Sequence, residues 1–244
     1  SSDLPRLHHR WREGETSIAG FLDDYAFFAW GLTELYEATF DPQWLGRAVE
    51  LTEEMNRLFI DEKCGGYFTT PVDGESILTR PKEFYDGAVP AGNSVAAHAL
   101  LRLSRLTGRG ELESMGRRAL DAASAEICGA PAHHTFSLLA LSHLLGPSFD
   151  VVVAGDSSDE ATLALLEPLS QDYLPHTVTL FRPTDGGVSQ ELQTVAPFTE
   201  HYGKRDGRAA AYVCRDGRCE LPTTKPDVML EHLHAGSRAA PPKA

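Results

Sequence analysis

Residues 20–60 read GFLDDYAFFAWGLTELYEATFDPQWLGRAVELTEEMNRLFI, and this stretch decides the expected fold. Apolar residues recur at three- and four-residue steps before and after Asp41-Pro42, which is the period of helices with one buried face. Proline suits the first turn of a new helix, and two helices joined by so short a turn are antiparallel neighbours. The stripe predicted for the first buried face comprises Phe21, Tyr25, Phe28, Ala29, Leu32, Leu35 and Tyr36.

The helix pair is repeated further along the chain. Helical patterns over residues 92–107 and 111–127 are again separated by a tight turn, and Ala29 and Leu32 lie 68 residues before Ala97 and Leu100. A repeated pair cannot bury its inner face alone, so we expect a mainly α fold that is part of an (α/α) helical-hairpin toroid. A fifth helix over residues 133–145 begins or completes a third unit.

The pattern changes after Gly146-Pro147. A β-branched run over residues 149–154, a helical segment over 159–173 and a strand over 177–181 predict two parallel strands joined by a crossover helix. Paired strands at 209–214 and 219–221 and a helix at 227–233 follow. We therefore expect a toroid portion over residues 1–147, a small α/β segment over residues 148–235 and a flexible tail over residues 236–244.

Composition excludes several classes of function. The chain has 244 residues, with 22 basic and 35 acidic side chains and a net charge of −13, which would repel the phosphate backbone of a nucleic acid. No apolar run is long enough to cross a membrane, and the first residues lack the apolar stretch of a signal peptide. We expect a cytoplasmic protein with no nucleic-acid or membrane partner, and no glycine-rich nucleotide motif or metal-ligand spacing predicts a cofactor or metal.

Two of the four cysteines, Cys214 and Cys219, flank the turn Arg215-Asp216-Gly217-Arg218. A hairpin there would bring the sulfurs together, either as a disulfide or as half of a zinc site completed by His232 or His234. Because cytosolic thiols are normally reduced, we expect two neighbouring reduced cysteines.

Several linked stretches occur in an order that resembles the C-terminal region of the spermatogenesis-associated protein 20 family, also called thioredoxin-domain-containing proteins. They are RLHHRWREGE, FLDDYAF, LYEATFDPQWL, RPKEFYDGAVPAGNS, LLRLSRLTG and AYVCRDGRCELP. The resemblance implies a fold similar to N-acylglucosamine 2-epimerase-like and six-hairpin glycosidase toroids, with a thioredoxin-like domain upstream as a partner within the same protein. One departure is Ala91, where the family usually has serine.

The 68-residue offset places Tyr25 opposite Asn93, so Asp23, Asp24 and Tyr25 are expected at the same end of the helices as Asn93. Helix N-termini present free N–H groups and partial positive charge, which suits carboxylates and polar ligands. Asp86 lies on the loop before Asn93. We predict Asp24 and Asp86 as catalytic acid and base. The predicted substrate-binding residues are Tyr25, Asn93, Trp11 and Asp23, with Trp11 beside His9 on an extended segment.

Each of these residues also has a structural explanation. Acids in a first helical turn stabilise the helix without a ligand, Tyr25 could belong to the core, and Asn93 could cap its helix. The first functional hypothesis is therefore a domain that binds or acts on a sugar-like small molecule, as an epimerase, isomerase or glycosidase. The second is a non-catalytic scaffold that supports the upstream thioredoxin-like redox domain.

Overall fold

The computed structural model describes residues 6–75, 78–186 and 189–237, and within them the chain is mostly helical with a small mixed β-sheet. It divides into two compact units. The first comprises Ser1–Tyr36 and Gln43–Leu144, and the second comprises Glu37–Pro42 and Leu145–Ala244. The predicted tail falls largely on residues 238–244, which lie outside the described residues.

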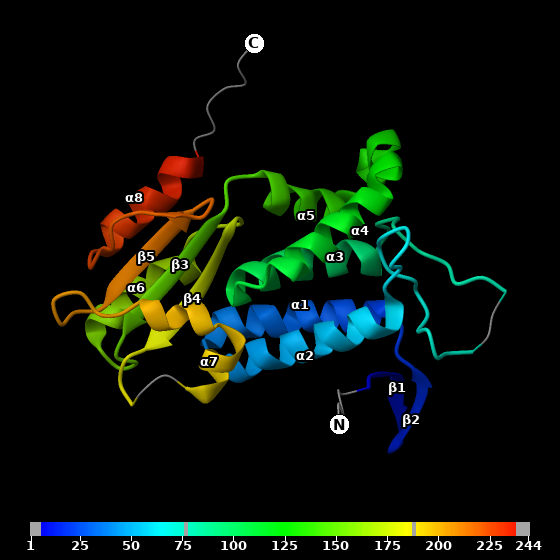
Figure 1. Ribbon diagram of the computed structural model, residues 1–244, viewed down its shortest axis with the longest axis horizontal. Coiled ribbons are helices and arrows are strands. Elements are labelled where there is room, and N and C mark those ends of the chain that lie inside the picture. The colour runs from blue at the N-terminus through cyan, green and yellow to red at the C-terminus, as the bar shows by residue number, and fades with distance from the viewer. Residues whose placement is uncertain (1–5, 76–77, 187–188, 238–244) are drawn as a thin grey trace, which may run out of the picture. The chain divides into compact units, whose positions relative to one another are not determined.

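The first unit is built from antiparallel helices (Figure 1). Pro42 opens the second helix, as expected, and the third helix has the predicted bounds. A left-handed Gly108, with a φ of 72°, ends the third helix and makes the tight turn to the fourth. The helices are α1 (Leu22–Thr39), α2 (Pro42–Phe59), α3 (Gly92–Thr107), α4 (Gly110–Gly129) and α5 (Thr135–Leu145), with a short 3-10 turn at Pro131–His133.

Two pairs of equivalent positions in the repeat are buried, as predicted. Ala29 and Ala97 are 0% and 1% exposed, and Leu32 and Leu100 are 7% and 0% exposed. The prediction was wrong for Phe28, which is 52% exposed, and for Leu35, which is 38% exposed. The apolar stripe of α1 is therefore wider than the face that its neighbours in the first unit cover.

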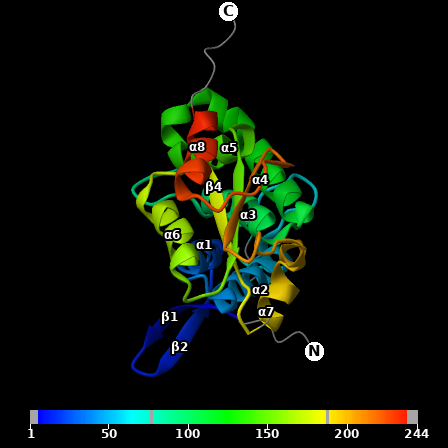
Figure 2. The ribbon, with the colours of Figure 1, turned by 90° about the vertical axis from the view of Figure 1, so that its left-hand side faces the viewer.

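A hairpin of β1 (His8–Arg12) and β2 (Glu15–Ala19) precedes α1, where the sequence indicated only an extended segment. Glu13 and Gly14 have φ angles of 53° and 87°, the pair of positive values that a two-residue hairpin turn requires. The hairpin extends away from the helices and all five residues of β1 are exposed (Figures 1 and 2). The hairpin was not predicted because its sequence lacks the alternation of apolar and polar residues that marks a half-buried strand.

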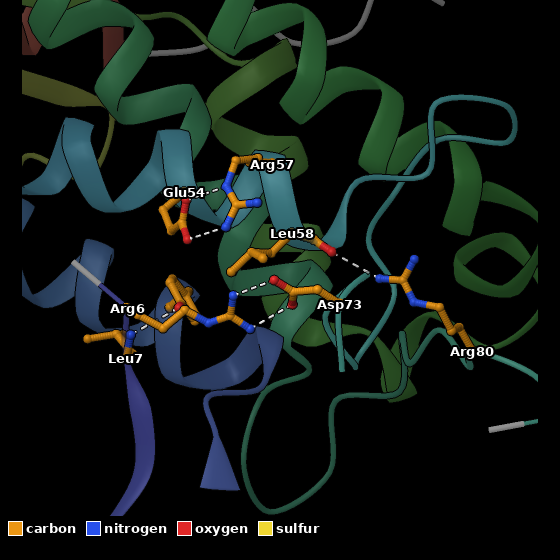
Figure 3. Close-up of polar contacts among 8 residues, drawn as sticks. Arg6, Leu7, Glu54, Arg57, Leu58, Asp73 and Arg80 are labelled. Carbon is orange, nitrogen blue, oxygen red and sulfur yellow. Dashed lines mark hydrogen bonds and ion pairs between the residues drawn. The ribbon is translucent and has the colours of Figure 1, made fainter. Parts of the chain in front are cut away.

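Basic residues anchor the irregular connection between α2 and α3 (Figure 3). Arg80 donates hydrogen bonds to the carbonyl oxygens of Leu58, at 3.0 Å, and Thr70. Arg6 forms two hydrogen bonds, of 2.6 and 2.7 Å, with Asp73. These charged side chains therefore hold the connection in place together with backbone hydrogen bonds to the start of α1 and the end of α2.

The second unit contains a four-stranded sheet with the order β4-β3-β5-β6. β3 (Phe149–Gly155) and β4 (Thr177–Pro183) are parallel, as predicted, and α6 (Glu160–Gln171) connects them. One face of the sheet packs on α6 and α8 (Pro226–Ser237) around Leu165 and Met229 (Figure 2). The short α7 (Gln190–Val195) and a 3-10 turn at Pro197–His201 were not predicted.

The hairpin of β5 (Ala210–Arg215) and β6 (Arg218–Cys219) corrects the thiol prediction. Asp216 and Gly217 both have positive φ angles, and this tight turn makes Cys214 and Cys219 direct partners across the strands. They are neighbours, as expected, but they form a disulfide instead of two reduced thiols.

Among the helices described, none has the length and apolar character that crossing a bilayer requires.

Candidate functional site

The N-terminal ends of α1 and α3 meet around two adjacent carboxylates. Asp23 and Asp24 lie in the first turn of α1, where free N–H groups and the helix dipole favour negative charge. The Asp24 carboxylate accepts a hydrogen bond of 2.8 Å from the backbone N–H of Phe21. The two acids therefore lie at a helix start, as predicted, and the hydrogen bond from Phe21 holds the Asp24 carboxylate there.

Asp23 reaches across to the first residue of α3, where its carboxylate accepts a hydrogen bond from the backbone N–H of Gly92. A Cβ atom at Gly92 would lie 2.1 Å from Oδ1 of Asp23, so only glycine permits this approach. Burial, followed by the charge of Asp24, raises the pKa of Asp23 above its ordinary value. Asp23 therefore keeps its proton to a higher pH than an aspartate with the ordinary pKa.

His9 joins the site from the N-terminal hairpin. Its Nδ1 atom lies 3.0 Å from Oδ2 of Asp24, and its ring packs edge-on against Phe21 with the centroids 5.1 Å apart. A histidine that donates through Nδ1 to a carboxylate keeps Nε2 as a proton acceptor. The pair of Asp24 and His9 thus has the arrangement of a base oriented by a carboxylate.

These carboxylates line an open pocket with a volume of about 460 Å³ in the first unit. The exposed ring of Phe28 and the partly buried ring of Phe27 follow Asp24 by one helical turn, so they share its face of α1. Val89, on the connection before α3, is also exposed. The pocket residues are Asp23, Asp24, Phe27, Phe28 and Val89.

Tyr25 and Asn93, both predicted to bind substrate, are used inside the fold. Tyr25 is fully buried, and its hydroxyl accepts a hydrogen bond of 3.0 Å from the backbone N–H of Leu7. Asn93 is 2% exposed; its Oδ1 accepts from the N–H of Tyr67 at 2.7 Å, and its Nδ2 donates to the carbonyl oxygens of Tyr67 and Glu83. Asn93 does not cap α3, because the residue before the helix is Ala91 and no side chain caps it.

Asp86, predicted as a catalytic carboxylate, organises the start of α5. Its Oδ2 atom accepts hydrogen bonds from the backbone N–H groups of Phe136 and Ser137, at 2.8 and 3.1 Å, and its Oδ1 atom accepts from Ala91 at 2.9 Å. The side chain thereby satisfies N–H groups that a helix start leaves free. Asp86 is buried and is not among the residues that line the pocket with Asp24.

Comparison with known proteins shows which proteins this chain resembles in sequence. No protein-family model matches it. Over 216 residues it is 35% identical to human spermatogenesis-associated protein 20, which covers 88% of this chain. The chain is homologous to that protein. The rat protein is also 35% identical over 216 residues, and uncharacterized protein B0495.5 of Caenorhabditis elegans is 26% identical over 211 residues.

The match to spermatogenesis-associated protein 20 is confined to part of that protein. The chain covers 27% of the human and rat proteins and 28% of the Caenorhabditis elegans protein, so it spans about a quarter of the length of these relatives. The family resemblance predicted from the linked sequence stretches is confirmed by this homology. Activity, substrates and partners of the longer proteins do not follow from it.

The remaining predicted residue is Trp11. It lies on β1 two residues after His9, is 72% exposed and is not among the pocket residues. Sequence reasoning did not select Phe27, Phe28 or Val89. The signal for the two phenylalanines was present, since they follow Asp24 at the spacing that places residues on one helical face. In the described part of the chain, no three histidine, cysteine or acidic side chains are grouped as metal ligands.

Proposed function

We propose that the pocket at the start of α1 binds a sugar-like polyol. The observation that carries this proposal is that two carboxylates, Asp23 and Asp24, share an open pocket with the exposed ring of Phe28. Carboxylate oxygens accept hydrogen bonds from vicinal hydroxyl groups, and an aromatic face contacts the apolar C–H face of a sugar ring. The mixture of acids and aromatic rings therefore suits a polyol better than an anion or a purely apolar ligand.

The same residues could transfer protons. In this proposal Asp23, whose pKa is raised by burial and by the Asp24 charge, acts as the acid, and Asp24 with His9 acts as the base. Asp23 thus replaces Asp86 as the second carboxylate, since the hydrogen bonds of Asp86 go to backbone groups of the fold. Epimerisation, isomerisation and glycoside hydrolysis all need such a pair.

We further propose that the first unit is part of a larger helical-hairpin toroid. The 68-residue repeat and the exposed apolar side chains Phe28 and Leu35 on α1 support additional hairpins beside the two complete ones. In such a ring the starts of α1 and α3 lie at one end, where the pocket opens. We also propose, from the family resemblance, that a thioredoxin-like domain lies upstream of this region in the same protein.

Sugar binding can be tested by calorimetry and ligand-observed NMR with a panel of monosaccharides and amino sugars. Phe28→Ala should weaken binding about tenfold, which corresponds to about 1.4 kcal/mol, because it removes an exposed stacking surface without opening the core. Asp23→Asn should weaken it by a similar factor. Leu139→Ala, on α5, is the matched control because this residue is 37% exposed and does not line the pocket.

A scaffold function is the second candidate, and the burial of Tyr25, Asp86 and Asn93 favours it. In a scaffold these residues serve only the fold, and the acids at the start of α1 only stabilise the helix. If no sugar in the panel binds, or if Phe28→Ala and Leu139→Ala bind a confirmed ligand as the parent does, the polyol proposal is wrong and the scaffold is favoured.

A further inference from the structure

A second concave surface lies entirely in the second unit, beyond the ends of the two parallel strands. β3 ends at Gly155 and β4 ends at Pro183, and a groove with a volume of about 390 Å³ opens where the chain leaves them. The carboxyl ends of parallel strands are the usual place for binding sites in α/β sheets. Most of the lining is apolar and includes Phe40, Leu163, Leu166, Phe181, Pro183 and Leu192.

Two apolar residues of the groove are placed at an energetic disadvantage. Leu163 on α6 is 52% exposed, although Leu165 two residues later is fully buried. Phe40 has a φ of 53°, a left-handed conformation that bulky residues rarely adopt, and its ring lies 6.1 Å from that of Phe181. Strained residues of this kind persist where the surrounding structure enforces them and often mark functional surfaces.

Three acidic residues lie next to residues that line the groove. Asp185 accepts hydrogen bonds from both the backbone N–H and the hydroxyl group of the lining residue Ser157, at 2.8 and 3.0 Å. The backbone hydrogen bond is the main reason that the pKa of Asp185 lies below its ordinary value. Glu160 precedes Leu163 by one helical turn, and Glu191 is adjacent to Leu192; both are exposed. The basic side chain of Lys204 is paired with Asp156, and among the described residues these three carboxylates form no ion pair.

The charge of this surface selects the class of partner. Anionic lipid headgroups and nucleic-acid phosphates would be repelled by the negative charge of these three carboxylates. A peptide segment with one apolar face and one basic face suits both the apolar groove and its acidic surroundings. Its apolar side chains can enter the groove while lysine or arginine faces the acids. We infer that this groove is a docking site for a basic amphipathic segment of a partner protein. This inference is independent of the polyol pocket in the first unit.

The test uses a fluorescein-labelled, 14-residue helical peptide of leucine and lysine as the probe, with fluorescence anisotropy in about 0.15 M salt as the readout. Leu163→Arg should weaken binding at least tenfold, because it places a positive charge on the apolar wall. The control is Leu221→Arg, which makes the same chemical change at a residue that is 86% exposed and does not line the groove. Circular dichroism verifies that both variants are folded.

A second pair of measurements tests the charge requirement. Glu160→Gln together with Glu191→Gln should weaken the leucine/lysine peptide several-fold and reduce the salt dependence of its affinity. A matched peptide of leucine and glutamate should bind at least tenfold more weakly. The inference is overturned if Leu163→Arg and Leu221→Arg weaken binding equally, since attraction would then depend on net charge alone. It is also overturned if the leucine/glutamate peptide binds as tightly as its basic counterpart.

Discussion

At the scale of single residues, Asn93 makes hydrogen bonds that join three segments of the first unit. Its amide group pairs with both backbone groups of Tyr67 and with the carbonyl oxygen of Glu83, which lie 26 and 10 residues away in the chain. In Asn93→Ala, three backbone groups would lose their hydrogen-bond partner: the N–H and C=O of Tyr67 and the C=O of Glu83. Each buried polar group left unsatisfied costs about 1–3 kcal/mol. The residue is thus expected to matter for folding before it matters for any ligand.

We predict that Asn93→Ala lowers the free energy of unfolding by about 3 kcal/mol, measured by urea denaturation followed by tryptophan fluorescence. Asp121→Ala, at an exposed position of α4, should change it by less than about 0.5 kcal/mol and serves as the control. Equal midpoints for Asn93→Ala and the parent protein would mean that these hydrogen bonds contribute no net stability. A ligand-binding role would then be the better explanation of this residue.

His98 on α3 is a buried histidine enclosed by other rings. It is 4% exposed, and the rings of Trp30, Phe136 and His143 lie with centroids 4.9–5.8 Å away. Burial, followed by the charge of Arg102 and by His143, lowers its pKa to about 2. The folded protein therefore keeps this imidazole neutral at pH values where the unfolded chain protonates it.

This difference predicts a loss of stability in mild acid. Because the folded pKa lies below the unfolded value of about 6.5, the unfolded state binds the extra proton first as the pH falls. Stability contributed by neutral His98 is complete above about pH 6.5 and should fall by about 1 kcal/mol between pH 6.5 and pH 5.5. His98→Phe, which keeps a ring, should lack this part of the decrease in urea denaturation at the two pH values. Identical pH dependence in the two proteins would refute the assignment.

At the scale of elements, the β5–β6 hairpin combines a tight turn with a covalent link. The positive φ angles of Asp216 and Gly217 set the register that makes Cys214 and Cys219 direct neighbours. The disulfide restricts the conformations that the unfolded segment can adopt. In the chain-entropy model, a link that closes so short a loop adds about 2 kcal/mol to the free energy of unfolding. Its effect should be concentrated in the second unit.

Thiol counting checks this element directly. In denaturant without reductant we expect two reactive thiols, Cys64 and Cys128, and four after reduction. Replacing Cys214 and Cys219 by serine should lower the free energy of unfolding of the second unit by about 2 kcal/mol. The matched change of Cys64 and Cys128, which are exposed, should leave it nearly unchanged. Four reactive thiols before reduction would restore the original expectation of a reduced pair.

Elements differ in how far the sequence predicts them, for physical reasons. The bounds of α3 were predicted because its apolar residues recur with a helical period between two turn signals. β1 carries no such signal, since all of its side chains are exposed. At the site, the local dipole argument placed Asp23 and Asp24 at the start of a helix. Two of the three partners of Asp86, in contrast, lie 50 and 51 residues away and follow no local pattern. Contacts of that kind are set by tertiary structure.

At the scale of the whole molecule, each unit has its own buried residues. Leu103 is fully buried in the first unit, and Leu165 is fully buried in the core of the second. The three tryptophans, Trp11, Trp30 and Trp44, all belong to the first unit, so tryptophan fluorescence reports on that unit alone. Units with separate cores can unfold separately even though the chain passes between them more than once.

We therefore predict that equivalent core cavities affect the two units differently. Leu165→Ala should cost about 2–5 kcal/mol in the second unit, seen as faster amide hydrogen exchange in β3 and α6, with an unchanged midpoint of tryptophan fluorescence in urea. Leu103→Ala creates the matched cavity in the first unit and should lower the fluorescence midpoint while leaving exchange in β3 slow. If either variant changes both signals together, the two units unfold as one. The disulfide and the pocket at the start of α1 would then depend on a single cooperative structure, so a change at Cys214 would also alter binding at Phe28.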